Sequence, residues 1–265
     1  MDTASMAALL EPYLERSLSP PELEQISIYI ELLLRWNART NLTAIRNEEE
    51  IVSRHFGESL FLARHLFPNS SQVFHPHPEE TCYPERSSRF AERKAAAESK
   101  APDPGSPPAA PEEAFTAALH PSQVMPPRVV DIGSGAGFPA IPVKIWAPDI
   151  RLTLIESNHK KAAFLNEVAR ALALTNVNVM NERTEALTTR LKSQADVVTL
   201  RAVEHFETIL PQAAAFLAPK GRLALLITTA QAQASRLGTL TSIEWCPDVR
   251  LPKSNTGLLS IGCKM

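Results

Sequence analysis

The sequence predicts an α/β fold, in which a parallel sheet carries helices on both faces and a small helical region precedes it. Three observations support this prediction. From residue 128 onward, short apolar runs alternate with helical stretches. Between residues 19 and 62, apolar side chains instead recur at helical spacing. A Pro-rich stretch with neither period lies between them, so we divide the chain into residues 1–67, 68–127 and 128–265.

The N-terminal region is expected to form a small helical cap. Ser19, Pro20 and Glu22 make a capping box, with proline at the first helical position and glutamate at the third. A second helix is expected to open at Asn47, because residues 48–50 are acidic and the helix dipole favours acids in the first turn. The apolar positions of the two helices are Leu23, Ile26, Ile30, Leu33, Leu34, Ile51, Val52, His55, Leu60 and Leu62.

The middle segment, residues 68–127, is expected to be a disordered Pro-rich insertion. Residues 70–125 hold nine of the 22 prolines and show little hydrophobic periodicity. Such a segment buries too little apolar surface to offset the entropy lost on ordering. It carries five basic and eight acidic residues, which leaves 22 basic and 21 acidic residues for the rest of the chain. The folded part is therefore nearly neutral, which permits an RNA ligand without arguing for one.

The C-terminal segment is expected to alternate strands with helices. The strands are residues 128–132, 152–156, 177–180, 196–200 and 222–227. One helix ends near Trp146, and two more span residues 158–172 and 206–217. Because a helix joins each strand to the next, the connections should be right-handed and the strands parallel. Two further strands, joined by a turn with Pro, Asn and Gly, are expected between Trp245 and Lys264.

The composition excludes several classes of protein. Hydrophobic residues make up 44% and charged residues 21% of the chain, and no apolar run approaches 18 residues, so no membrane span is expected. The first residues lack the basic and long apolar parts of a signal peptide. Cys82, Cys246 and Cys263 form neither a CxxC pair nor a zinc spacing, which suits a reducing compartment. We expect a cytoplasmic protein without a metal site.

A glycine-rich loop follows the first expected strand. Residues 131–137 read DIGSGAG, and glycine there lets the backbone turn tightly and approach a ligand closely. The dinucleotide fingerprint G-x-G-x-x-G would need glycine at position 138, where Phe138 stands, and no P-loop motif occurs. The pattern G-x-G-x-G, with Asp131 at the end of the strand, is typical of S-adenosylmethionine enzymes. The Asp131 carboxylate can orient the loop and receive the ammonium of the methionine part, directly or through water.

Glu156 ends the second expected strand, about 20 residues beyond the glycines. A carboxylate at this place can accept both hydroxyls of a ribose. It would serve a nicotinamide ribose equally well, so a nicotinamide-dependent oxidoreductase stays open beside an S-adenosylmethionine enzyme. A methyltransferase for another substrate, or a protein that binds the cofactor without methyl transfer, also stays open.

Several short motifs on both sides of the insertion accompany the loop. They are Trp36-Asn37 with residues 40–43, Arg54-His55 with Glu58-Ser59, residues 131–142, residues 156–165, residues 183–185 and residues 200–202. On these motifs the chain resembles the 16S ribosomal RNA guanine-N7 methyltransferases of the RsmG type, also called glucose-inhibited division protein B. It departs from their pattern at Glu58 (usually aspartate), at Phe138 (usually leucine) and at Thr228-Thr229, where a Lys-Gly pair is usual.

The resemblance implies a class I, Rossmann-like methyltransferase sheet and a set of cofactor-binding residues. Gly133 and Phe138 would line the methionine and ribose side, and Glu156 would hold the ribose. Thr184 and Glu185 would flank the adenine, and Arg201 would lie at the mouth where the methyl group is transferred. The whole expected set is Asp131, Gly133, Ser134, Gly135, Gly137, Phe138, Glu156, Thr184, Glu185 and Arg201.

The resemblance also implies the reaction, transfer of a methyl group from S-adenosyl-L-methionine to N7 of a guanine in 16S ribosomal RNA. The RNA would lie within the small ribosomal subunit or its assembly intermediate, and we expect a monomeric enzyme. Guanine N7 has a free lone pair, so no general base is required and no catalytic base is expected. Arg46 and Arg54 are candidates for phosphate contacts, and His55 reads as a buried structural residue. Replacing Arg201 with alanine is expected to weaken methylation without disturbing the fold.

Overall fold

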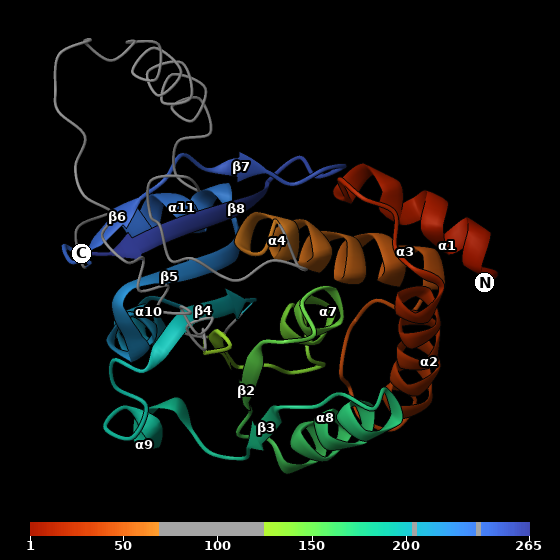
Figure 1. Cartoon of the computed structure of the whole chain (residues 1–265), viewed down its shortest axis with the longest axis horizontal. Helices are drawn as coiled ribbons and strands as arrows, with labels where there is room; N and C mark the ends of the chain where they lie inside the picture. The colour runs from red at the N-terminus through yellow and green to blue at the C-terminus, as the bar shows by residue number, and fades with distance from the viewer. Residues whose placement is uncertain (69–124, 203–205, 237–239) are drawn as a thin grey trace, which may run out of the picture. The chain divides into compact units, whose positions relative to one another are not determined.

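The sheet expected from residue 128 onward is present in the computed structural model, which describes residues 1–68, 125–202, 206–236 and 240–265 (Figure 1). The side chains of residues 233–236 are outside the description as well. The insertion expected at residues 68–127 lies, apart from its ends, outside the described residues. The elements below belong to one unit, which comprises Met1–Pro76 and Pro126–Met265.

The described residues contribute eight strands to one sheet, in the order β3-β2-β1-β4-β5-β8-β6, with β7 paired to β8. The strands are β1 (Arg128–Ile132), β2 (Arg151–Ile155), β3 (Val177–Met180), β4 (Ala195–Arg201), β5 (Leu217–Thr228), β6 (Ile243–Trp245), β7 (Val249–Arg250) and β8 (Gly257–Lys264). The strands from β3 to β5 are parallel to one another, and β8 is antiparallel to β5 and to β6. The strand order reverses between β1 and β4, and such a switch point places a crevice at the carboxyl ends of these strands.

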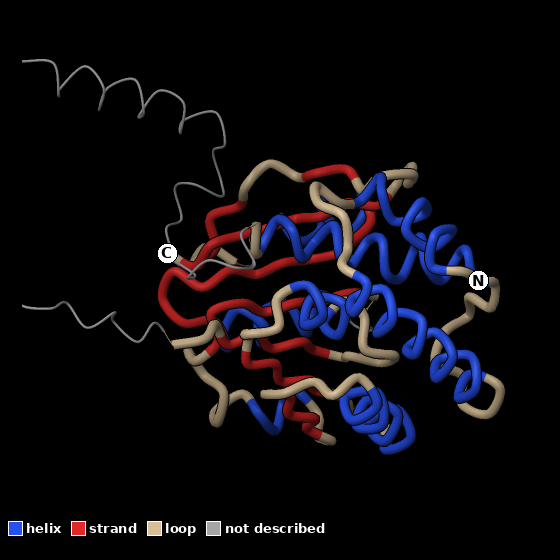
Figure 2. Tube along the Cα trace, turned by 45° about the vertical axis from the view of Figure 1, so that its right-hand side comes forward, coloured by secondary structure: helices blue, strands red, loops and turns tan. Residues whose placement is uncertain are grey.

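Alternating side chains of the strands enter two separate hydrophobic cores. Val129 of β1 belongs to one core, and its neighbours Val130 and Ile132 belong to the other. Because successive side chains of a strand point to opposite faces, both faces of the sheet are buried. In Figure 2 the strands run side by side and the helices are set around them.

The N-terminal helices and two helices of the α/β segment share the first core. They are α1 (Thr3–Leu10), α2 (Pro20–Asn37), α4 (Glu58–Leu66), α7 (Ala140–Trp146) and α8 (His159–Ala171). The short helix α3 (Glu48–Glu50) has no buried residue. Helix α2 contacts α7 and α8, and α4 contacts α7, which is visible in Figure 1. The N-terminal region is therefore part of the layer that covers one face of the sheet.

The first predicted N-terminal helix is confirmed. Helix α2 begins after Ser19, whose backbone N–H donates to the Glu22 carboxylate at 2.7 Å. The second predicted helix is interrupted: between α3 and α4, residues Ile51–Gly57 form a π-helical segment. A side chain at Gly57 would lie 2.7 Å from the ring of Tyr13, which sits in a 3₁₀ turn (Glu11–Tyr13). Glycine lets this segment pack closely against that ring.

The second face carries α9 (Thr184–Leu187), α10 (Phe206–Phe216) and α11 (Thr229–Arg236). The C-terminal end differs from the prediction, because three strands, β6, β7 and β8, replace the expected two. Strand β5 also starts at Leu217 instead of residue 222. The pairing of β4 with β5 shifts its register between Ala195 and Val197, so Leu217 pairs with Ala195 while residues 218–221 are skipped.

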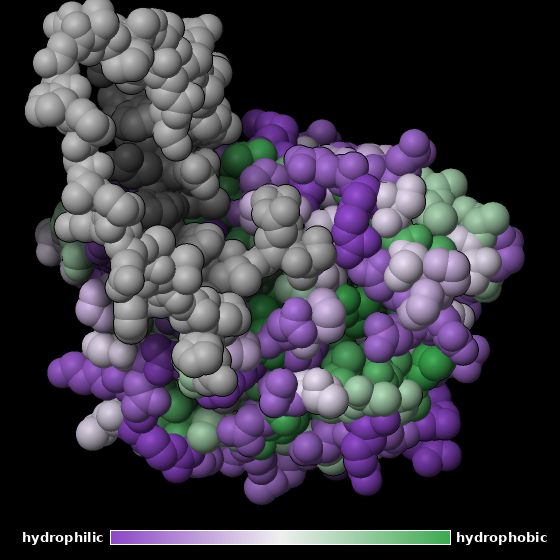
Figure 3. Space-filling model, in the orientation of Figure 1, coloured by the Kyte–Doolittle hydropathy of each residue, from purple (hydrophilic) through white to green (hydrophobic). Residues whose placement is uncertain are grey.

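Hydrophilic side chains cover most of the coloured surface in Figure 3, and hydrophobic ones form smaller patches among them. Among the described residues no helix is both long and apolar enough to cross a bilayer. The large apolar side chains are mostly inside: the largest fully buried ones include Trp146, Tyr29 and Phe56.

Candidate functional site

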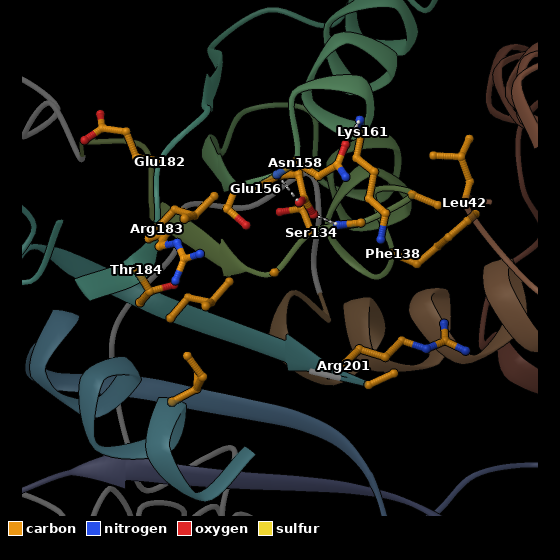
Figure 4. A pocket seen from close by; sticks show the side chains of 18 of the residues that line it. Leu42, Ser134, Phe138, Glu156, Asn158, Lys161, Glu182, Arg183, Thr184 and Arg201 are labelled. Carbon is orange, nitrogen blue, oxygen red and sulfur yellow. Dashed lines mark hydrogen bonds between the residues drawn. The ribbon is translucent and has the colours of Figure 1, made fainter. Parts of the chain in front are cut away.

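A pocket of about 700 Å³ lies at the carboxyl ends of the parallel strands (Figure 4). This size is typical of sites for small molecules and cofactors. The loops after β1, β2, β3 and β4 supply most of its wall, and the N-terminal region supplies the rest. The wall comprises Leu42, Thr43, His55, residues 132–136, Phe138, residues 155–158, Lys161, residues 182–185, Arg201, Ala202 and Ile209.

The glycine loop adopts the backbone conformation that glycine favours. The φ angles of Gly133, Gly135 and Gly137 are 67°, 54° and 88°, in the left-handed region where other residues are strained. The N–H groups of Gly133 and Ser134 donate to the carbonyl of Ile155 at 2.9 and 3.0 Å, which ties the loop to the end of β2. The nearest heavy atom to a Cβ on Gly135 would be the Gly133 carbonyl oxygen, at 3.7 Å. The loop thus presents bare backbone to the pocket, as the sequence predicted.

Glu156 lies in the wall, 7% exposed, and its carboxylate holds two backbone N–H groups. One oxygen accepts from Gly135 at 2.8 Å and the other from Asn158 at 2.7 Å; Figure 4 shows Glu156 beside Asn158 and the glycine loop. A carboxylate oxygen can accept two hydrogen bonds, so each retains one site for a hydroxyl. Glu156 therefore fits the expected role of a ribose ligand and also builds the loop that surrounds the site.

Asp131 lies beneath the pocket and is not part of its wall, although a direct contact with the ligand was one expectation. It is 1% exposed, and its Oδ1 accepts from the Thr199 hydroxyl at 2.6 Å. Its Oδ2 is buried without a hydrogen-bond partner among the described residues. Burial raises the pKa of Asp131 to about 6, against the opposing effect of the Thr199 hydrogen bond. Ser134 is in the wall, and its hydroxyl donates to the Asp131 carbonyl at 3.2 Å.

Gly137 faces the N-terminal helix α2 and is absent from the pocket wall, in contrast to the expectation for the third glycine. A side chain there would lie 2.5 Å from the hydroxyl of Tyr29 and 2.7 Å from Ile141. The reason is packing: helix α2 approaches the loop so closely that no Cβ fits. The following residue, Phe138, does lie in the wall, as expected.

Thr184 and Glu185 begin α9 and both lie in the wall, on the side formed by the loop after β3. Thr184 is buried and Glu185 is exposed. Their place next to the end of β2 is compatible with the adenine side of a nucleoside whose ribose meets Glu156. Their role beside an adenine stays a prediction.

Arg201, the last residue of β4, lies in the wall but its guanidinium is bound to the N-terminal region. It donates to Glu58 at 2.6 Å and to the Arg54 carbonyl at 2.9 Å. Figure 4 shows its side chain directed away from Glu156. The glutamate that replaces the usual aspartate at position 58 is the partner that holds it.

The two candidate RNA-binding arginines lie outside the pocket wall. Both are exposed. Arg54 forms an ion pair with Glu50 at 3.2 Å on the same helical stretch. Arg46 follows the loop that places Leu42 and Thr43 in the wall.

Sequence reasoning missed the side chains that shape this loop. Asn37, at the end of α2, accepts from the N–H groups of Leu42 and Thr43 at 2.9 and 3.0 Å and donates to the Thr43 carbonyl at 2.9 Å. The Thr43 hydroxyl lies 2.7 Å from Nε2 of His55, which also lies in the pocket wall. Burial, with the nearby Arg201 charge, lowers the pKa of His55 to about 3, so its ring is neutral. The motif of Trp36-Asn37 followed by residues 40–43 is the sequence pattern that could have indicated these contacts.

A family model described as "rRNA small subunit methyltransferase G" (GidB) matches residues 22–74 and 115–244, more than half of the chain. The chain belongs to the rRNA small subunit methyltransferase G family. The resemblance found in the sequence motifs is thereby confirmed. The matched stretches contain every residue of the pocket wall.

Curated members of the rRNA small subunit methyltransferase G family support the assignment along most of the chain. A "Ribosomal RNA small subunit methyltransferase G" of Roseiflexus sp. is 33% identical over 82% of this chain and 73% of that protein. Proteins of the same name from Chloroflexus aggregans and Xylella fastidiosa are 32% and 30% identical, over 77% and 84% of this chain and 66% and 79% of theirs. The chain spans 66%, 65% and 57% of three such relatives, so it covers about two thirds of their length or less.

Among solved structures, the chain is similar to the TYW2 protein of M. jannaschii in complex with AdoMet. The sequence identity is 18%, the TM-score is 0.44, and the match covers 53% of this chain and 68% of that chain. So distant a likeness carries no weight in the family assignment.

Within the described ranges, no group of three or more His, Cys, Asp or Glu side chains could hold a metal ion.

Proposed function

We propose that this protein transfers a methyl group from S-adenosyl-L-methionine to N7 of a guanine in 16S ribosomal RNA. The main support is the pocket at the switch point of the sheet, which the G-x-G-x-G loop and Glu156 help to form. The chain also belongs to the rRNA small subunit methyltransferase G family. S-adenosylmethionine enzymes use such a loop with a ribose acid, whereas Phe138 replaces the glycine that a dinucleotide fingerprint requires.

The residues present fit the cofactor. Gly133 and Gly135 offer backbone without side chains, and a Cβ on Gly135 would contact only the Gly133 carbonyl oxygen, at 3.7 Å. Glu156 retains one acceptor site on each oxygen for the two ribose hydroxyls. Thr184 and Glu185 would flank the adenine. The cofactor supplies a methyl group on a sulfonium, an electrophile that needs no further activation.

The residues around the pocket do not need to remove a proton. Guanine N7 carries a free in-plane lone pair, so methyl transfer would form an N–C bond and break the S–C bond of the sulfonium without loss of a proton. The pKa of His55 is lowered to about 3, its Nε2 lies against the Thr43 hydroxyl and its Nδ1 is buried, so it is not arranged as a general base. The wall holds the reactants in line and excludes water, and proximity and orientation supply the rate.

We infer that the RNA is bound within the small ribosomal subunit or its assembly intermediate, by a monomeric protein in the cytoplasm. An unpaired guanine suits a pocket that takes one base, since proteins read RNA sequence in single-stranded regions. Arg46 is the better candidate for a phosphate contact, because it is exposed and no ion pair involves it among the described residues. Arg54 is already paired with Glu50.

The reaction is tested by incubating the protein with tritiated S-adenosylmethionine and small ribosomal subunits that lack the modification. We expect label in N7-methylguanosine after digestion of the RNA. Fully modified subunits are the matched control and should take up no label. Label only in protein or in small metabolites would overturn the proposal.

Measurements of ligand affinity distinguish the proposed methyltransferase from a nicotinamide-dependent oxidoreductase. Calorimetry with S-adenosylmethionine, NAD and NADP should show the first ligand binding at least tenfold more tightly than the other two. Tighter binding of either nicotinamide nucleotide would favour an oxidoreductase, because Glu156 could serve either ribose.

A further inference from the structure

Tyr29 touches the glycine loop from behind, although it is absent from the pocket wall. It lies within α2 and is 0% exposed. Its hydroxyl donates a hydrogen bond to the carbonyl of Ala136. Its oxygen also occupies the space that a side chain on Gly137 would need. Tyr29 therefore contacts adjacent residues of the loop with a single polar group.

The ring of Tyr29 holds the next residue of the loop. It is stacked on Phe138, with ring centroids 5.2 Å apart and planes 7° apart. Phe138 is also stacked with His55, at 4.6 Å and 15°. The ring of Phe56 packs nearly perpendicular to both Tyr29 and Phe138. Aromatic pairs of this geometry add to simple burial, so Phe138 has little freedom to turn.

These contacts reach the pocket through Ala136, Phe138 and His55, all three of which are wall residues. The Ala136 carbonyl is buried with its residue, and a buried acceptor that loses its hydrogen-bond partner is left desolvated without compensation. A loop without that hydrogen bond would populate other conformations. Ligand binding would then include the free energy of restoring the bound conformation.

We propose that Tyr29 is a positioning residue, which holds residues 136–138 in the conformation that binds the cofactor. This inference rests on the proposed function, because it concerns the affinity of the same pocket. Tyr29 should affect ligand affinity and not the rate at saturation, because the loop regains its conformation once ligand saturates the site. Removing the hydroxyl should therefore weaken affinity and leave the rate at saturation nearly unchanged.

The test is Tyr29→Phe in the full chain, which keeps the ring and removes one oxygen. We expect the Kd for S-adenosylmethionine to rise about five- to tenfold, and the KM for the cofactor to rise with kcat retained. The matched control is Tyr13→Phe, because Tyr13 is also a buried tyrosine of the N-terminal region but its ring packs against Gly57. This control should bind as the wild type does.

A second measurement separates positioning from loss of stability. Amide hydrogen exchange in a peptide covering the glycine loop should be faster in ligand-free Tyr29→Phe and should return to the wild-type rate at saturating ligand. Unchanged Kd and exchange in Tyr29→Phe, or an equal loss of affinity in Tyr13→Phe, would overturn the inference. Wild-type protein that does not bind S-adenosylmethionine would instead overturn the proposed function, so the two failures are distinguishable.

Discussion

At the scale of single residues, Glu156 shows how one carboxylate both builds and serves a site. Its oxygens hold the N–H groups of Gly135 and Asn158. In Glu156→Gln one oxygen becomes an amide NH₂ that opposes an N–H group. We expect S-adenosylmethionine affinity to fall at least tenfold and stability to fall by about 1–3 kcal/mol, as measured by calorimetry and thermal denaturation.

The control for this substitution is Glu182→Gln. Glu182 is a wall residue as well, but its carboxylate pairs with Arg190 at 2.6 Å, and Figure 4 shows it far from Glu156. We expect its affinity to stay within about twofold of the wild type, since an exposed ion pair contributes little. Equal losses in both variants would mean that pocket charge, and not the contacts of Glu156, determines affinity.

Two glycines of the loop should respond differently to alanine. Gly137 has no room for a Cβ beside Tyr29 and Ile141, so Gly137→Ala should destabilise the fold by about 2–5 kcal/mol. Gly135 has room, so Gly135→Ala should lose only about 1–2 kcal/mol from its left-handed φ but weaken ligand binding. Denaturant unfolding and calorimetry on both variants check this. The reverse pattern would contradict our placement of Gly137 against α2.

Asp131 should leave a signature in the pH dependence of stability. Its folded-state pKa, raised to about 6 by burial, lies above the unfolded value of 3.8. Between these values the folded state binds more protons, so the contribution of Asp131 to stability falls as pH rises from about 4 to 6. Asp131→Asn should therefore gain stability relative to wild type over this range, by at most about 3 kcal/mol. Urea unfolding at pH 4.5 and 7 measures the gain.

At the scale of elements, Arg201 and Glu58 join the end of β4 to the N-terminal helices. Both side chains are 13% exposed, and Arg201 also binds the Arg54 carbonyl. Arg201→Ala leaves a mostly buried carboxylate without its partner, so we expect a loss of about 3 kcal/mol in unfolding free energy. This differs from the expectation, drawn from sequence, that the fold would be undisturbed.

The double variant Glu58→Gln/Arg201→Ala separates the loss of the ion pair from the cost of leaving one buried charge unpaired. Because no buried charge is left unpaired, it should be more stable than Arg201→Ala alone. Urea denaturation of the wild type, the two single variants and the double variant completes the cycle. The free energy lost in the double variant could instead equal the sum of the losses in the two single variants. The two side chains would then act independently, and the ion pair would not be what joins the elements.

The elements that could be predicted from sequence are those that local residues determine. Ser19 and Glu22 start α2, and apolar runs mark β1 and β2. The π-helical segment and the register shift after Ala195 depend on contacts with distant residues, such as Tyr13 against Gly57. The same distinction holds in the pocket. Gly133 and Glu156 are visible in a motif, whereas the contact of Tyr29 with Ala136 joins residues 107 positions apart.

At the scale of the whole unit, residues before and after the insertion share one hydrophobic core. Ile26 and Leu33 of α2 belong to the same core as Leu165 of α8 and Val129 of β1. Sequence periodicity shows that α2 has an apolar face but not which surface covers it. The structure shows that the face packs on α7 and α8, which also brings Tyr29 to the glycine loop.

A shared core predicts that the unit unfolds in one cooperative transition. The chain has three tryptophans: Trp36 in α2, Trp146 in α7 and Trp245 in β6. Trp146→Phe combined with Trp245→Phe leaves a probe in the N-terminal region, and Trp36→Phe combined with Trp146→Phe leaves one at the far edge of the sheet. Both variants lose the same buried indole at position 146, so they are matched in that perturbation. In guanidinium, fluorescence and far-ultraviolet circular dichroism should give coincident midpoints within each variant. If instead Trp36 reports a transition well before the loss of circular dichroism, the N-terminal helices unfold separately and do not share the stability of the sheet that carries the pocket.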